Sequence, residues 1–251
     1  MKFWLDDVRA SLGAALFAVI AVGFCAISAR ADDLSDAEAA YRDGRYATAL
    51  ELFKPLADAG STDAMIRLAQ LYSGKEGVAP DHAKAFALYR QLAKQGVPAG
   101  ERGLGTKYYT GFGTPKDLGL AAHWFSLAAA HGDSFAQMIL GTMYMKGEGV
   151  PVDEQKGIKW IRTAADAGDT TAQYLLGTFS EHGVGTTANL VEALKWYLIA
   201  DQNKFGFEER PTVALARQRI LTLSMIMTPD GVTKAKELAK DWKPHSADDT
   251  F

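Results

Sequence analysis

Cysteine is nearly absent from this 251-residue chain, and Cys25 is the only one. It lies within an N-terminal segment that we expect to be removed, which would leave a mature chain without any thiol. Such a chain has no disulfide, no thiol nucleophile and no thiolate metal site. Lipid attachment at Cys25 is also not expected, because a lipoprotein signal needs a small residue before its cysteine and Phe24 stands there.

Positive charge is not in excess either. The chain has 27 Lys and Arg against 30 Asp and Glu, for a net charge of −3 at pH 7. Binding to phosphate backbones requires clustered Lys and Arg, and the sequence has no such cluster, so we expect no nucleic-acid partner. The 48% hydrophobic and 23% charged residues are typical of a folded protein and argue against general disorder.

Sequence motifs of catalysis are lacking as well. The chain has no S-x-x-K, G-x-S-x-G or H-E-x-x-H. Gly132-Asp133-Ser134 resembles a hydrolase serine site, but Gly168-Asp169-Thr170 occupies the same frame, so both belong to a repeat. His123 and His131 would stand about 12 Å apart along a helix, too far to share one metal ion. We therefore expect no catalytic residue, no metal and no cofactor.

A long uncharged run is present near the N-terminus, over Ser11–Ile27. It is followed by Ala29-Arg30-Ala31, which fits an A-x-A cleavage site. These features predict a signal peptide over residues 1–31, cleaved between Ala31 and Asp32. The alternative is an uncleaved membrane anchor, although 17 residues are at the short limit for crossing a bilayer. Either interpretation places the rest of the chain outside the cytoplasm: periplasmic after cleavage, or membrane-attached only through this segment.

An internal repeat of 36 residues is the strongest signal in the sequence. Four full units cover residues 61–96, 97–132, 133–168 and 169–204, and a repeat of this length predicts stacked supersecondary units. The columns that recur at this step are Gly60, Gly96, Gly132 and Gly168; Leu68, Leu104, Leu140 and Leu176; Gly77, Gly113, Gly149 and Gly185; and Trp124, Trp160 and Trp196.

Each unit has the pattern of two antiparallel helices, called here helix A and helix B. In unit 133–168, apolar residues of helix A recur at i, i+3, i+4, i+7 and i+8 from Ala136 to Tyr144. The glycine-rich loop 146–151 breaks the helix, and Asp153 is placed to cap helix B. A column of small residues on helix A, with Gly141 as its member here, predicts a close approach of helix B. We expect the tryptophan column to be core between repeats, with a ladder for stacking a ligand as the alternative.

The two ends of the repeat array differ from its middle, as expected for a solenoid. Residues 32–60 form a shorter, tetratricopeptide-like half repeat that caps the N-terminal end. Residues 205–242 are predicted to be capping helices, one over 211–227 and one that begins at Thr228-Pro229. We expect the polar tail 243–251 to be disordered.

The repeat resembles the Sel1-like repeat, a relative of the tetratricopeptide repeat. The residues of unit 133–168 that carry the resemblance are Ala136, Leu140-Gly141, Tyr144, Gly147, Gly149-Val150, Asp153, Trp160-Ile161, Ala164-Ala165 and Gly168. Unit 169–204 departs from the pattern at Ser180 and Asp201. The resemblance implies an all-α fold, a right-handed α-α superhelix of helix pairs, and a function in protein binding.

The resemblance also implies where a partner would bind, namely at outward positions of helix A on the concave face. Carried onto this sequence, these positions are Gln70, Ser73, Arg102, Thr106, Tyr109, Met138, Thr142, Met145, Tyr174, Thr178 and Glu181. The expected partner is a protein or peptide, such as an envelope sensor or assembly complex, and the chain would act as a scaffold or regulator outside the cytoplasm. Alternatives are an envelope hydrolase acting on β-lactams or cell-wall material, and a membrane-anchored spacer.

Overall fold

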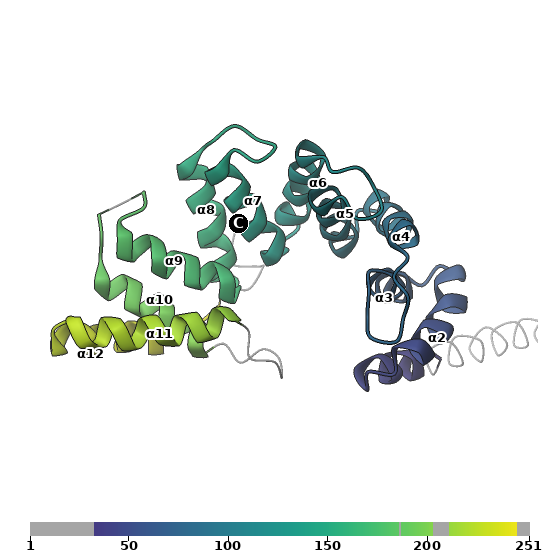
Figure 1. Ribbon diagram of the computed structural model, residues 1–251. Helices are drawn as coiled ribbons and strands as arrows, with labels where there is room; N and C mark the ends of the chain where they lie inside the picture. The colour runs from purple at the N-terminus through teal and green to yellow at the C-terminus, as the bar shows by residue number, and fades with distance from the viewer. Residues whose placement is uncertain (1–32, 186, 203–210, 245–251) are drawn as a thin grey trace, which may run out of the picture. The chain divides into compact units, whose positions relative to one another are not determined.

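A computed structural model describes residues 33–185, 187–202 and 211–244 of the chain (Figure 1). Secondary structure in these ranges is helical, apart from one isolated bridge between Lys75 and Val78. The predicted signal segment 1–31, its cleavage site at Ala31 and Asp32, and most of the tail 243–251 lie outside the described residues. None of the helices found in the described ranges is long and apolar enough to cross a bilayer.

The chain divides within helix α4 (His82–Lys94) into two compact units, one up to Leu88 and one from Tyr89. In the first unit, residues 33–42 are helical, followed by α2 (Tyr46–Asp58) and α3 (Thr62–Tyr72). Helix α2 packs against α3, and Phe53 and Leu71 are fully buried. The segment 32–60, predicted as an N-terminal half repeat, thus contains two helices, and the second of them packs on the first helix of the next repeat.

The second unit consists of helix pairs and two closing helices. Helices α5 and α6, α7 and α8, and α9 and α10 pack as pairs, while α6 packs on α7 and α8 on α9 (Figure 1). This succession confirms the all-α solenoid class predicted from the repeat. The helices are α5 (Pro98–Thr110), α6 (Leu118–Ala130), α7 (Ser134–Lys146), α8 (Glu154–Asp166), α9 (Thr170–His182), α10 (Leu190–Gln202), α11 (Pro211–Ile226) and α12 (Pro229–Lys240).

Local residues fix where the repeat helices begin and end. Asp133 and Asp153 accept a hydrogen bond from the backbone N–H three residues ahead, at 2.8 and 2.9 Å, and so cap α7 and α8. Asp117 and Asp169 do the same for α6 and α9. Helix α7 ends at Gly147, whose φ of 71° is favourable only for glycine. The cap predicted at Asp153 is confirmed.

The small-residue column lets the two helices of a pair approach closely. A Cβ atom on Gly141 would lie 2.7 Å from Ile161 Cγ1 and 2.8 Å from the Gly157 carbonyl oxygen. Both distances are shorter than van der Waals contact, so a larger side chain would push α7 and α8 apart. The predicted tight packing at this column is confirmed.

The tryptophan column is fully buried only in the last repeat. Trp196 is 1% exposed, and its Nε1 donates to Glu192 at 2.8 Å. Trp124 and Trp160 are half-buried, so the expectation of a uniform core column is only partly correct. Trp196 differs because α12 packs on α10 and Trp242 meets its ring edge-on, with the centroids 6.4 Å apart.

In each of these repeats, the residue that follows the tryptophan in sequence is a large side chain buried in the core of the helix pair. Phe125, Ile161 and Tyr197 are each at most 1% exposed. They face the small residues of helix A, since a Cβ on Gly105 would lie 3.0 Å from Phe125 and one on Gly177 would lie 2.5 Å from Tyr197. A large side chain on helix B therefore fills the space that a small residue leaves on helix A.

Candidate partner-binding face

The eleven predicted positions lie on the helix A elements α3, α5, α7 and α9 or at the C-terminal end of α3. Within a helix they recur at i, i+4 and i+7, which places them on one side. Ten are partly buried, and Met138 is buried. None is a freely solvated side chain, so the contacts of each decide what it can do.

In the first unit, Gln70 and Ser73 take part in an internal polar network. Gln70 Oε1 accepts hydrogen bonds from the Tyr41 hydroxyl and the Arg67 guanidinium, each at 3.3 Å. Arg67 also pairs with Glu38 at 2.7 Å. The Ser73 hydroxyl donates to the Ala69 carbonyl at 2.8 Å. The contacts with Tyr41 and Glu38 fasten α3 to the helix over residues 33–42, whereas the Ser73 bond is local to the end of α3.

On α5, Arg102 and Thr106 lie beside the start of α7. Arg102 pairs with Asp133 at 3.4 Å, and its side chain stays 38% exposed. The Thr106 hydroxyl donates to the Arg102 carbonyl at 2.9 Å, within the same helix. Because Asp133 also caps α7, one carboxylate joins two consecutive repeats while Arg102 remains accessible.

Tyr109 joins α5 to the loop that follows α7. Its hydroxyl donates to Glu148 Oε2 at 2.8 Å, and its ring meets Phe125 edge-on with the centroids 6.4 Å apart. The Lys116 Nζ atom lies 5.8 Å from the centre of the Tyr109 ring. The hydrogen bond to Glu148, together with burial, raises the pKa of Tyr109. The phenol therefore stays protonated in neutral solution and acts as a donor with a fixed orientation.

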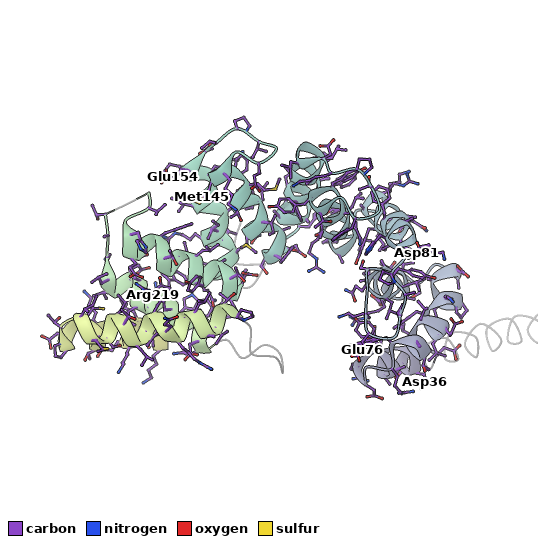
Figure 2. All side chains as sticks on the ribbon, in the orientation of Figure 1. Asp36, Glu76, Asp81, Met145, Glu154 and Arg219 are labelled. Atoms are coloured by element: carbon purple, nitrogen blue, oxygen red, sulfur yellow. The ribbon has the colours of Figure 1, made fainter. Side chains whose placement is uncertain are left out.

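On α7 the two predicted methionines are packing residues. Met138 is 8% exposed and belongs to a core cluster with Ile161 and Leu176. Met145, labelled in Figure 2, packs against the same cluster, and a Cβ on Gly157 would lie 2.5 Å from its Cγ. The repeats stack so closely that these positions contact α8 and the next repeat. Of the three predicted α7 residues, only Thr142 remains at the face.

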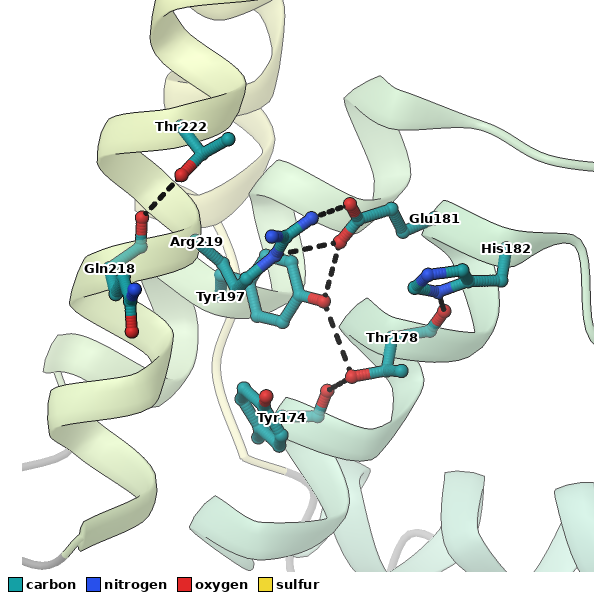
Figure 3. Close-up of polar contacts among 8 residues, drawn as sticks. All are labelled: Tyr174, Thr178, Glu181, His182, Tyr197, Gln218, Arg219 and Thr222. Atoms are coloured by element: carbon teal, nitrogen blue, oxygen red, sulfur yellow. Dashed lines mark hydrogen bonds and ion pairs between the residues drawn. The ribbon is translucent and has the colours of Figure 1, made fainter.

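On α9 the predicted positions Tyr174, Thr178 and Glu181 lie under α11 (Figure 3). The Arg219 guanidinium forms an ion pair with Glu181, whose side chain is 10% exposed. The Tyr197 hydroxyl lies 2.9 Å from Glu181 Oε2 and 3.2 Å from Thr178 Oγ1. Tyr174 packs against the cluster that α10 forms with α11. Helix α11 of the same chain thus covers this part of the predicted face.

We expect Arg219→Ala to loosen α11 and lower the free energy of unfolding by about 1–3 kcal/mol, because Glu181 would lose its charged partner while largely buried. Hydrogen exchange of the α11 amides and chemical denaturation measure the effect. The matched control is Arg217→Ala on the same helix. Arg217 pairs with Asp201 at 2.6 Å while 51% exposed, and exposed pairs contribute about 0–1 kcal/mol. Equal losses in the two variants would contradict the role given to Arg219.

The residues that remain accessible form a smaller surface, named here the α5–α7 face. It consists of Arg102, Thr106, Tyr109, Thr142 and Glu148. It presents a guanidinium, an aromatic ring, a carboxylate and two threonine side chains. Ion pairs and hydrogen bonds between consecutive repeats hold Arg102, Tyr109 and Glu148 in place.

Two buried charged residues of α5 were missed by the sequence analysis. Glu101 is 2% exposed, and its Oε2 lies 2.8 Å from the Nδ1 of His131. Lys107 is 5% exposed, and burial lowers its pKa. The repeat alignment carries a signal for Lys107, because Leu71, Met143 and Phe179 occupy the same column. No cluster of three metal-ligating side chains occurs in the described part of the chain.

Comparison with known proteins gives four matches to the family model for the Sel1 repeat. They cover residues 62–97, 98–133, 134–169 and 170–200, and begin one residue after the units predicted from the sequence. Among solved structures, a Sel1 repeat protein from Oxalobacter formigenes superimposes with a TM-score of 0.63 at 25% identity, over 83% of this chain and 96% of that one. A protective antigen of uropathogenic Escherichia coli, described as displaying an SLR fold, gives a TM-score of 0.67 at 31% identity, over 77% of this chain and 40% of that one.

Among curated proteins, a negative regulator of exopolysaccharide production from Rhizobium leguminosarum bv. viciae is 35% identical over 66 residues. The match covers 26% of this chain and 25% of that protein. The regulator of the same description from Rhizobium meliloti is 36% identical over a stretch of the same length. This chain thus spans about a quarter of the length of the curated relatives it matches.

Proposed function

The chain belongs to the Sel1 repeat family, and from that premise we propose that it is a scaffold or regulator that binds a partner protein or peptide on the α5–α7 face. Sel1 repeat proteins are generally protein-interaction scaffolds. The observation that carries the proposal is the set of partly exposed side chains held between repeats, with Arg102 and Tyr109 at its centre.

Residue type and side-chain order both favour binding at this face. Arginine and tyrosine are enriched among the residues that contribute most to binding free energy in protein interfaces. Arg102 is oriented by Asp133 and Tyr109 by Glu148, so both are already ordered before a partner arrives. Less conformational entropy is then lost on binding, which favours affinity.

The proposed role is regulation or assembly outside the cytoplasm. Similarity to negative regulators of exopolysaccharide production over 66 residues supports a regulatory scaffold. The uncharged run Ser11–Ile27, followed by Ala29-Arg30-Ala31, supports export to the periplasm. An envelope sensor or assembly complex is the proposed class of partner. Sel1 repeat proteins are typically non-enzymatic, and no observation favours the hydrolase alternative.

A double variant, Thr106→Arg with Thr142→Arg, should reduce recovery of the partner about tenfold, which corresponds to about 1.4 kcal/mol. The two arginines would place charge and bulk on the α5–α7 face without touching the deep core. The measurement is crosslinking in the native host, followed by quantitative mass spectrometry of the proteins bound to each variant.

The matched control is Thr163→Arg on α8. Thr163 donates its hydroxyl to the Lys159 carbonyl at 3.0 Å, as Thr142 does to the Met138 carbonyl at 2.7 Å, so the same local bond is lost on helix B. Recovery should stay at the parent level in the control. Unchanged recovery in the double variant, with an unchanged circular dichroism spectrum, would count against this face.

A further inference from the structure

The outer side of α11 carries a solvent-exposed strip of uncharged side chains, named here the α11 outer face, with the exposed Arg217 at its edge. Its large apolar side chains are strongly exposed: Leu215 by 46%, Leu221 by 68%, Met225 by 85% and Ile226 by 66%. The exposed residues of this face are Ala214, Leu215, Gln218, Leu221, Thr222, Met225 and Ile226. Contiguous apolar exposure of this kind is unusual on a monomer and marks interaction sites.

The two closing helices, α11 and α12, differ in the kind of side chain that they expose to solvent. The last helices of a repeat array normally have a polar outer side, which keeps the array soluble. Helix α12 follows this rule, since Lys234, Lys236 and Lys240 are exposed. The two charged residues of α11, both arginines, instead pair with Asp201 and Glu181. The α11 outer face therefore lacks the charged side chains that keep the end of a repeat array soluble.

The order of residues on this face suits a second copy of the same helix. In an antiparallel pair with its two-fold axis midway between Gln218 and Thr222, Gln218 faces Thr222 of the second copy. In the same register, Leu215 faces Met225 of the second copy, and Leu221, one residue from the axis, lies beside its own counterpart. Polar side chains thus meet polar ones and apolar side chains meet apolar ones. No charge opposes a like charge, as an isologous interface requires.

We propose that the α11 outer face is the interface of an antiparallel homodimer of this chain. With 16 residues, α11 is about 24 Å long. A helix pair of that length lies near the lower limit of about 1,000 Å² for specific interfaces. We therefore expect a weak dimer whose formation depends on protein concentration. A membrane surface is disfavoured as the occupant, because interfacial helices use free Lys and Arg to contact lipid headgroups, and both arginines of α11 are in ion pairs.

Sedimentation velocity on the purified protein, from low micromolar to near-millimolar concentration, tests the proposal. The parent should shift from monomer to dimer across this range. Leu221→Glu should weaken association about tenfold or more, because two carboxylates would meet near the two-fold axis. The control is Leu238→Glu on α12, where the same change is made at a side chain that is 41% exposed, and it should dimerise like the parent.

A charge-swap experiment tests whether Leu221 of one copy lies beside Leu221 of the other, as the proposed antiparallel dimer requires. Leu221→Glu and Leu221→Lys alone should each associate about tenfold or more weakly than the parent, and an equimolar mixture should recover the association of the parent, because opposite charges then meet near the axis. A parent that stays monomeric throughout, or a mixture that does not associate, would overturn the proposal. Thermal melting checks that each variant is folded. Partner binding at Thr106 and Thr142 uses other helices, so failure of one proposal leaves the other standing.

Discussion

Trp196→Ala should lower the free energy of unfolding by about 3–5 kcal/mol, as expected for removing a buried tryptophan. Trp196 is 1% exposed and lies in the cluster that also contains Ile161, Leu176 and Ala239. The truncation would leave a cavity between α10 and α12 and would take away the hydrogen bond from Trp196 Nε1 to Glu192. Guanidinium denaturation followed by far-UV circular dichroism measures the loss.

The control for Trp196 is Trp124→Ala, in the same column of an earlier repeat. Trp124 is half-buried, and the closing helices α11 and α12 pack on α9 and α10 instead. Its truncation should therefore cost only about 1–2 kcal/mol. Losses of the same size at both positions would show that the column is a uniform core, in disagreement with the burial that α12 produces at Trp196.

The second large effect is expected from Gly141→Ala, which should destabilise the protein by about 1–3 kcal/mol through overpacking. The added methyl group would lie 2.7 Å from Ile161 Cγ1 and 2.8 Å from the Gly157 carbonyl oxygen. Backbone on α8 cannot move away without separating the helix pair. The clash must outweigh the preference of about 1 kcal/mol that alanine has over glycine in a helix. Chemical denaturation and thermal melting report the result.

Gly119→Ala on α6 is the matched control for this substitution. A Cβ at Gly119 would lie 3.4 Å from Asp117 Oδ1, its nearest neighbour, which is an ordinary contact. The same chemical change should therefore be neutral or stabilise by about 0.4–1 kcal/mol, because it restricts the unfolded chain. If Gly141→Ala also left stability unchanged, the close approach of α7 and α8 would not be a constraint on this fold.

The proposed partner-binding face depends on which helix A positions stay accessible, and the sequence alone was insufficient to identify them. Tyr174 and Glu181 have the same spacing in their unit as Arg102 and Tyr109 have in theirs. Only the position of α11 distinguishes the two sets, and Arg219 lies 38 residues along the chain from Glu181. A repeat pattern assigns equal roles to equivalent positions, whereas the end of the array has a neighbour that the middle lacks.

By itself, the sequence determined the repeat, the helix pairs and their boundaries. These depend on local chemistry: a carboxylate such as Asp153 caps the helix that follows it, a glycine such as Gly147 ends one, and apolar periodicity selects the buried side. Only the tertiary structure decided that Met138 and Met145 pack against the core, that α12 buries Trp196 and that α11 exposes four large apolar side chains. These properties are set by contacts between segments far apart in the sequence, and side-chain burial is a property of such contacts, which no local pattern contains.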